Sequence, residues 1–289
     1  MKAIVYKDFG GSDVISYEEV QNPVLKNEND VLIEVKAASV NPLDLKIRQG
    51  FMQKMRPVSL PYIPGLDVAG IVKSVGKEVQ GIQVGDEVIA ITMGNAYAEF
   101  VIANATFIAP KPKNISFEEA SSLAVNIGTA QTILFNEGQL KSGDRILIQG
   151  AAGAVGATMV QMAKLQGLYV YATASGKGVA FVKNLGADEV FDYKASGFSL
   201  DMRELDLVAD CAGGEAQQNL FQVLKAGGKL LSIAGMPSAE LANQFKVDAR
   251  FISSNLTAQN LISGFENVAE GKIKPFVSQV FPLNEAAQA

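Results

Sequence analysis

The feature that most constrains this chain is a short apolar run that ends in small residues and leads straight into an amphipathic pattern. Residues 145–149 (RILIQ) are typical of a buried strand, and residues 150–156 (GAAGAVG) are typical of a tight turn. Residues 154–166 then predict a helix with Val155, Met159, Met162 and Ala163 on one side. A strand, a glycine turn and a helix in this order form the start of a βαβ unit that binds the diphosphate of a dinucleotide.

The glycine turn supplies a first set of candidate binding residues. Gly153 would allow the backbone to approach a pyrophosphate, and Gly156 would allow the helix to pack close to the strand. Ala151 stands where the fingerprint has its first glycine, which is a departure from the pattern. The alternative is that small residues only permit a tight turn. The candidate contacts are Ala152, Gly153, Ala154, Val155 and Gly156.

The rest of the chain predicts two domains of different architecture. From Ser116, where a helix cap is followed by two acids, strands and helices alternate, which predicts a doubly wound parallel α/β domain over residues 121–256. Residues 1–120 contain short Val- and Ile-rich runs between turn signals, which predict a β-barrel or sandwich. Residues 271–289 look strand-like and then begin a helix at Asn284. Residues 257–289 are assigned to the first domain. A further helix and strand are expected beyond them.

The predicted elements can be given by residue number. In the first domain the predicted strands are 2–6, 31–40, 68–75, 87–91 and 98–102. In the second domain the predicted strands are 145–149, 169–174, 189–192, 205–211 and 229–234, with helices over 154–166 and 179–185.

Composition excludes several kinds of chemistry. The 289 residues include no histidine and a single cysteine, Cys211. Zinc sites draw mainly on Cys and His, so a catalytic or structural zinc of the usual form is excluded, as are Ser-His-Asp and Cys-His mechanisms. The net charge of −5 comes without a basic tract, which argues against nucleic acid as a partner. With no apolar run long enough for a bilayer and no secretory signal, a cytoplasmic protein is predicted.

The end of the second predicted strand indicates which dinucleotide is bound. NAD sites place Asp or Glu there to hold the ribose 2′-hydroxyl. Here the strand ends in Ser175, Gly176 and Lys177, so a hydroxyl and an ammonium are available for a 2′-phosphate, and Tyr193 adds a second hydroxyl from the neighbouring loop. The pattern predicts NADPH as the cofactor. The alternative is an ordinary polar turn.

The chain resembles the zinc-independent quinone oxidoreductase and enone reductase branch of the medium-chain dehydrogenases. The resemblance is carried by ASVNPLD (38–44), IRQG (47–50), PGLDVAG (64–70), VGDEV (84–88), GTA (128–130), GAAGAVG (150–156), LGADEV (185–190) and GKIKP (271–275). Zinc-dependent relatives carry Gly-His-Glu where this chain has Gly65, Leu66 and Asp67. The resemblance implies a GroES-like barrel domain, a Rossmann nucleotide domain and a homodimer that pairs strands near 245–253.

The resemblance also implies site residues. It places Asn41 and Thr129 near the nicotinamide, together with the strand ends Cys211, Ala212 and Gly213, and Ala234 and Gly235. Many quinone reductases of this branch carry tyrosine where this chain has Lys46 and Met52. The stretch Asn-Pro-x-Asp-x-Lys is closer to that of plant alkenal and enone reductases, which favours a small electrophilic acceptor with a conjugated carbonyl.

The expected chemistry needs few side chains. Hydride delivered to such an acceptor builds negative charge on its oxygen, and Lys46 is the candidate electrophile or proton donor if partial burial lowers its pKa. Lys46 could instead be a solvated side chain or pair with Asp44. Cys211 is interpreted as an inert buried thiol, and an apolar acceptor pocket is assigned only weakly to Phe51, Met52, Met55, Tyr62 and Met93.

Two other functions remain open from the residues. An S-adenosylmethionine methyltransferase also has a glycine-rich loop after its first strand, but it would want an acid at the end of the second strand and has no use for the N-terminal barrel. A non-catalytic NADPH-binding sensor or scaffold fits the same nucleotide site.

Overall fold

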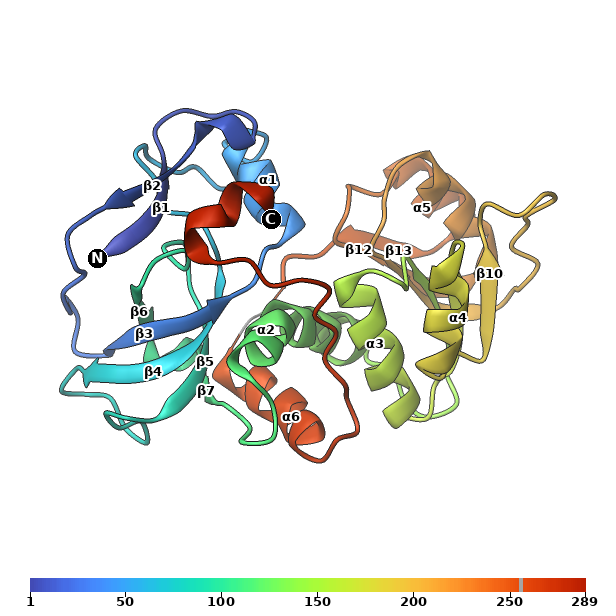
Figure 1. Ribbon diagram of the computed structural model, residues 1–289. Coiled ribbons are helices and arrows are strands. Elements are labelled where there is room, and N and C mark those ends of the chain that lie inside the picture. The colour runs from blue at the N-terminus through green and yellow to red at the C-terminus, as the bar shows by residue number, and fades with distance from the viewer. Residues whose placement is uncertain (255–256) are drawn as a thin grey trace. The chain divides into compact units, whose positions relative to one another are not determined.

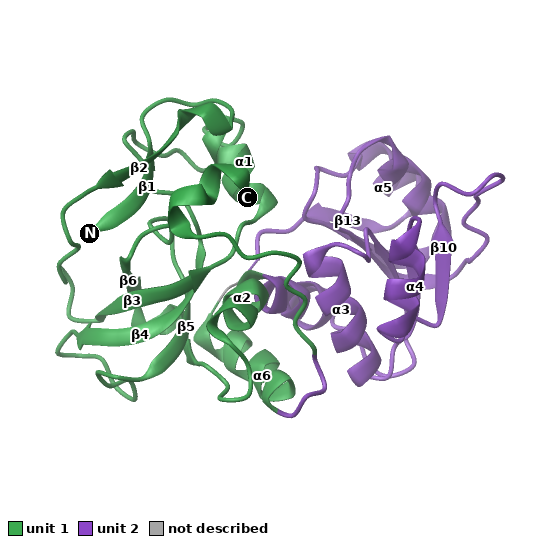
Figure 2. Cartoon of the chain, viewed as in Figure 1, with its two compact units in different colours: residues 1–125, 256–269, 274–289 green, residues 126–255, 270–273 purple. Residues whose placement is uncertain are grey.

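The fold contains one large parallel sheet and one large antiparallel sheet. The structure is a computed structural model that describes residues 1–254 and 257–289. The chain divides into unit 1, residues 1–125, 256–269 and 274–289, and unit 2, residues 126–255 and 270–273 (Figure 2). The predicted domain boundary at residue 256 lies outside the described residues.

The sheet of unit 2 has six parallel strands in the order β10-β9-β8-β11-β12-β13. A parallel sheet whose chain order reverses beside its first strand is the doubly wound arrangement, so this part of the prediction is confirmed. The strands are β8 (Arg145–Gln149), β9 (Tyr169–Ala174), β10 (Glu189–Asp192), β11 (Leu205–Asp210), β12 (Leu224–Ser232) and β13 (Asp248–Phe251).

Helices pack against the parallel sheet because its strands are apolar on both faces. Ile146, Leu147 and Ile148 of β8 are all fully buried. Two helices pack against β8, β9 and β10, and the remaining ones pack against β11, β12 and β13 (Figure 1). They are α3 (Ala154–Leu165) and α4 (Lys177–Asn184), and then the 3-10 helix η4 (Glu215–Val223) and α5 (Ala239–Phe245).

Two elements of unit 2 begin two residues or more before their predicted first residue. Helix α4 begins at Lys177 and not at Val179, because Gly176 at its N-cap adopts φ 54° and ψ −128°, which ends the strand and starts the helix at once. Strand β12 begins at Leu224, well before Lys229, because Leu224 pairs with Leu205 across an irregularity in register.

Unit 1 is built from antiparallel strands, as predicted for residues 1–120. A two-stranded sheet joins β1 (Lys2–Tyr6) to β2 (Ile15–Glu19). A five-stranded sheet has the order β6-β3-β4-β5-β7, and its inward residues, among them Val31, Ile33, Val68 and Val72, form a common core. Its strands are β3 (Asp30–Ala38), β4 (Asp67–Val75), β5 (Glu87–Ile91), β6 (Phe100–Asn104) and β7 (Ile108–Pro110).

Helices of unit 1 begin where the sequence supplies caps. Ser116 and Glu119 exchange hydrogen bonds at the start of α2 (Phe117–Gln131), which confirms the predicted cap; α2 runs on from unit 1 into unit 2. Pro42 opens α1 (Pro42–Arg48) at the position where its missing N–H costs nothing. The others are α6 (Ala258–Ala269) and the short helices η1 (Ser12–Val14), η2 (Ala105–Phe107), η3 (Thr132–Glu137, in unit 2) and η5 (Leu283–Gln288).

The strand-like reading of the last segment was wrong. Residues 274–282 form no strand, and most of them are exposed. Pro275 and Pro282 each remove a backbone donor that a sheet ladder would need. The helix expected from Asn284 is present as the short 3-10 helix η5.

Candidate functional site

The turn after β8 has the geometry that a phosphate-binding turn requires. Gly150 adopts φ 75°, in the left-handed region, and accepts a hydrogen bond from the Gly153 N–H at 3.0 Å. A Cβ added at Gly156 would lie 2.4 Å from the Gly150 carbonyl oxygen, so helix α3 can sit this close only because residue 156 has no side chain. The sequence pattern matched Ala151 to the first glycine of the fingerprint, whereas Gly150, at the end of the strand, is the residue that adopts the left-handed conformation.

Solvent exposure falls along this turn from residue 152 to residue 156. Ala152, Gly153 and Ala154 are exposed, Val155 is half-buried and Gly156 is buried. The first N–H groups of α3 have no partner inside the helix, and the helix dipole adds positive potential at the same point. The exposed part of the turn therefore offers backbone donors and only methyl-sized side chains to an anion.

The end of β9 brings the predicted 2′-phosphate residues close together. The Ser175 hydroxyl donates to the Tyr193 hydroxyl at 3.0 Å, although the two residues lie 18 positions apart. Lys177 is exposed at the first position of α4. A Cβ added at Gly178 would lie 3.0 Å from Cβ of Ala152, so this cluster adjoins the glycine turn. No carboxylate occupies positions 175–177.

The turns after β11 and β12 meet the glycine turn at the same edge of the sheet. A Cβ on Gly150 would lie 3.3 Å from Cβ of Ala212, and one on Gly213 would lie 3.0 Å from Cβ of Ala234. Cys211 and Ala212 thus lie beside the glycine turn, and Ala234 lies beside Gly213 in the next turn along this edge. Burial, with a smaller contribution from the neighbouring Asp210 charge, raises the pKa of the Cys211 thiol to about 12, so this thiol stays protonated near neutral pH.

Thr129, the remaining candidate in unit 2, lies inside α2 and is buried. Its hydroxyl is 2.8 Å from the Ser254 hydroxyl, so helix α2 is hydrogen-bonded to the segment that follows β13. A contact between Thr129 and a cofactor stays a prediction.

In unit 1, Asn41 is held by a buried carboxyl group. Its side-chain nitrogen donates to Oδ2 of Asp67 at 2.9 Å and to the Ser39 hydroxyl at 3.1 Å, while the Ser39 hydroxyl donates to the same Oδ2 at 2.5 Å. Both amide hydrogens are used, so only the Asn41 carbonyl oxygen remains to accept a hydrogen bond.

Asp67 is an unusual group, since its side chain is buried and Oδ1 has no hydrogen-bond partner among the residues that the structure describes. Burial raises its pKa to about 7, against the lowering effect of Ser39 and Asn41. Asp44 adds to this rise, because its own buried carboxyl group carries like charge. Asp67 is therefore largely neutral in mildly acidic solution. Sequence reasoning noted position 67 only as part of a family motif, and its burial was not foreseen.

Lys46 does not have the partial burial on which its predicted pKa depended. Its side chain is exposed on α1. Asp44, its alternative partner, instead accepts hydrogen bonds from the Asn41 N–H at 2.9 Å and the Tyr97 hydroxyl at 3.0 Å. A proton-donating role for Lys46 is untested.

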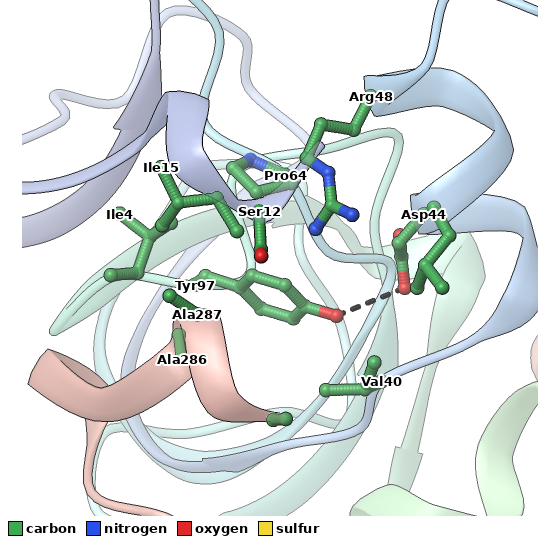
Figure 3. A pocket seen from close by; sticks show the side chains of 12 residues that line it. Ile4, Ser12, Ile15, Val40, Asp44, Arg48, Pro64, Tyr97, Ala286 and Ala287 are labelled. Carbon is green, nitrogen blue, oxygen red and sulfur yellow. Dashed lines mark hydrogen bonds between the residues drawn. The ribbon is translucent and has the colours of Figure 1, made fainter. Parts of the chain in front are cut away.

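A pocket of about 190 Å³ lies within unit 1, and Figure 3 shows Tyr97 reaching across it to Asp44 with Arg48 above. Apolar side chains from β1, β2 and η5 complete its wall; those drawn include Ile4, Ile15, Ala286 and Ala287. The residues predicted to line an acceptor pocket are not among its lining residues. Phe51, Met55 and Met93 instead expose 75%, 65% and 75% of their surface.

Among the described residues, no three His, Cys, Asp or Glu side chains gather as metal ligands would. The exclusion of a His- or Cys-based zinc site rests on the composition itself.

Comparison with known proteins identifies the family. Residues 27–113 match the alcohol dehydrogenase GroES-like domain, and residues 185–289 match the zinc-binding dehydrogenase family. The chloroplast envelope quinone oxidoreductase homolog of Arabidopsis thaliana is 35% identical over 309 aligned positions, which cover 100% of this chain and 93% of that protein. The chain belongs to the quinone oxidoreductase family of medium-chain dehydrogenases.

Other members of this family are similar over the same span. The NADPH-dependent alkenal/one oxidoreductase of Arabidopsis thaliana chloroplasts is 35% identical, covering 100% of this chain and 75% of that protein. The structure of the Coxiella burnetii quinone oxidoreductase has a TM-score of 0.90 at 33% identity, covering 100% of this chain and 93% of that one. The Escherichia coli quinone oxidoreductase complexed with NADPH has a TM-score of 0.89 at 26% identity, covering 100% and 94%.

These matches confirm the predicted family and fold class, a GroES-like domain with a Rossmann domain. The family model for residues 185–289 is named for zinc, yet Leu66 stands where zinc-dependent relatives carry histidine, and the chain has no histidine elsewhere.

Proposed function

We propose that this member of the quinone oxidoreductase family uses NADPH to reduce quinones or α,β-unsaturated carbonyl compounds without a metal. The observation that carries the proposal is the end of β9, where Ser175, Tyr193 and Lys177 stand together without an acid beside an open glycine turn. An acid there would repel a 2′-phosphate, whereas these groups bind it.

The residues present fit this cofactor on structural grounds. Gly156 permits a helix–turn approach that any Cβ would block, and Gly178 lets the 2′-phosphate cluster adjoin the same turn. The turn would hold the diphosphate and the β9 end the adenosine phosphate. When bound, the dihydronicotinamide supplies a hydride from its C4 atom.

The chain's own groups then have limited tasks. The turns after β11 and β12 would hold the nicotinamide half, since they lie on the other side of the glycine turn from β9. The Asn41 carbonyl oxygen, presented by Asp67 and Ser39, would accept a hydrogen bond from a ribose hydroxyl or the carboxamide. Lys46, exposed to solvent, would deliver a proton to the reduced acceptor.

The acceptor class is supported by the relatives, which include quinone oxidoreductases, an alkenal/one oxidoreductase and a 2-methylene-furan-3-one reductase of Solanum lycopersicum that is 38% identical over 247 positions. The direct test follows NADPH and NADH oxidation with quinones, alkenals and cyclic enones. Faster NADPH oxidation with at least one acceptor is expected. Tight NADPH binding without turnover of any acceptor would instead support the sensor or scaffold alternative.

We also propose a homodimer and a cytoplasmic location. Strand β13 ends the six-stranded sheet, and no other strand within residues 1–254 and 257–289 pairs with its outer edge, where a second copy of the chain would pair. No described helix is long and apolar enough to cross a membrane. Size-exclusion chromatography with light scattering tests the dimer.

A further inference from the structure

A buried carboxylate lies between the turn after β11, which borders the glycine turn, and the turn after β12. Asp210 ends β11 and its side chain is fully buried. Oδ1 accepts the backbone N–H groups of Ala212 at 3.0 Å and Gly213 at 2.7 Å. Oδ2 accepts Nε2 of Gln217 at 2.7 Å and the Ser232 hydroxyl at 2.8 Å. The two oxygens are thus satisfied by four uncharged donors.

The same network continues into the turn after β12. The Ser232 hydroxyl oxygen accepts the N–H groups of Ala234 and Gly235, each at 3.2 Å. Nε2 of Gln217, on η4, also reaches the Gly235 carbonyl oxygen at 3.3 Å. The Asp210 carboxylate therefore fixes the turn after β11 directly. It fixes the turn after β12 through Ser232 and Gln217, each of which bonds both to Asp210 and to that turn.

The order of strands in the sheet indicates which half of a dinucleotide these two turns would contact. Strand β8 carries the glycine turn and has β9 on one side and β11, followed by β12, on the other. A dinucleotide whose diphosphate lies at the β8 turn extends in both directions along the carboxyl edge of the sheet. With its adenosine half at the end of β9, the other half must lie over β11 and β12.

We propose that Asp210 is a positioning residue that orders these two turns in advance for the nicotinamide half of the cofactor. This inference rests on the proposed function. Asp210 itself is fully buried and does not touch the ligand. Its effect is on the backbone of residues 211–213 and 234–235, which would otherwise have to be ordered at the moment of binding.

The substitution Asp210→Asn tests this with little change in shape. One of the two acceptor oxygens becomes a donor. If the new NH₂ faces Ala212 and Gly213, two backbone donors lose their acceptor; if it faces Gln217, two amide donors oppose each other. Either orientation loosens a turn, because a buried donor without an acceptor is unfavourable.

The experiment compares whole and partial ligands on the same protein. NADP⁺ would contact the whole site, whereas adenosine 2′,5′-bisphosphate would contact the end of β9 and the glycine turn but not the turns after β11 and β12. In Asp210→Asn we expect the dissociation constant for NADP⁺ to rise about tenfold or more, with that for adenosine 2′,5′-bisphosphate changed by less than about twofold, both by calorimetry. Ser232→Ala, a milder change in the same network, should show the same pattern at a smaller size.

The matched control is Asp206→Asn. Asp206 lies near the opposite end of the same strand, where it pairs with Lys225, so neither ligand should lose affinity. Equal losses of both ligands in Asp210→Asn and Ser232→Ala, or no loss of either, would overturn the positioning role. Failure of the unmodified protein to bind either ligand would instead overturn the proposed function.

Discussion

At the scale of single residues, the proposed preference for NADPH depends on a very small area of the surface. Ser175 and Tyr193 share a hydrogen bond, and Lys177 lies two residues from Ser175, at the positive end of α4. A hydroxyl pair, an ammonium and a helix N-terminus together provide donors and positive charge where an NAD enzyme keeps a carboxylate.

Reversing the charge of Lys177 should therefore affect one coenzyme selectively. In Lys177→Asp we expect kcat/KM for NADPH to fall by at least about tenfold, because an exposed attraction becomes a repulsion. The value for NADH, which lacks the 2′-phosphate, should stay within about threefold. Steady-state rates with both coenzymes measure this, and equal losses would contradict the assignment.

The buried carboxyl group of Asp67 predicts an unusual pH dependence of stability. Its folded-state pKa of about 7 lies above the ordinary value of 3.8, so the folded protein keeps a proton that the unfolded chain releases. Stability from this group is present at low pH and is lost as pH rises towards 7, by roughly 2–4 kcal/mol. The raised pKa of Asp44 acts in the same direction.

Thermal unfolding at about pH 5 and pH 8 checks this expectation. The midpoint should be lower at the higher pH, and Asp67→Asn should reduce the difference, since Asn keeps an oxygen for Ser39 and Asn41 but cannot ionise. A variant that retains the full pH difference would show that other groups cause it.

Lys46 can be tested apart from binding. If its ammonium delivers the proton, Lys46→Met should lower kcat by about tenfold or more while the dissociation constant of NADPH is unchanged. Lys54→Met, which removes another exposed lysine from the same unit, is the control and should leave kcat unchanged. A normal kcat in Lys46→Met would leave solvent as the proton source.

At the scale of secondary structure, the unit β8–turn–α3 combines a packing requirement with a binding surface. Gly156 is needed for packing, because its Cβ would meet backbone atoms at 2.4 Å and 2.7 Å. Gly153 meets only one backbone atom, at 3.3 Å, and has φ −77°, which any residue adopts. The two glycines therefore serve different purposes.

Alanine at each position should separate these purposes. Gly156→Ala should lower the free energy of unfolding by about 1–3 kcal/mol, because the backbone must move apart. Gly153→Ala should keep its stability and lose NADPH affinity, because the added methyl group lies where the diphosphate approaches. Denaturant unfolding and calorimetry make the comparison; the same loss of stability in both variants would contradict it.

At the scale of the whole chain, periodic patterns predicted the fold well where each segment is continuous and buried. Strands β1, β5, β8 and β9 were placed to the residue, since each is a short, mostly buried and apolar run bounded by turns. The partly exposed β10 was also placed to the residue. Three-residue β7 and half-buried β2 carry too weak a pattern, and the last segment looked like a strand although none of the strands in the described part of the chain pairs with it.

The arrangement of the candidate site residues could be predicted from the sequence only in part. Ser175 and Tyr193 could be brought together from sequence because both follow adjacent parallel strands. The burial of Asp67 and the exposure of Lys46 depend on packing around α1 and β4, to which local sequence gives no access.

Composition makes one prediction for the whole protein. With no histidine and one cysteine, NADPH oxidation should not depend on zinc. Prolonged dialysis against a chelator should leave the rate unchanged, with metal content followed by mass spectrometry. Loss of activity that returns with zinc would contradict this.

The backbone nature of the glycine turn has a practical consequence for engineering. Because the turn offers N–H groups and little more than methyl groups, few substitutions there can favour one coenzyme over the other without disturbing both. Under the proposed assignment, substitutions at positions 175, 177 and 193 would change the preference and leave the binding of the diphosphate intact. Affinity for the diphosphate and preference between the two coenzymes would thus be changed by separate substitutions.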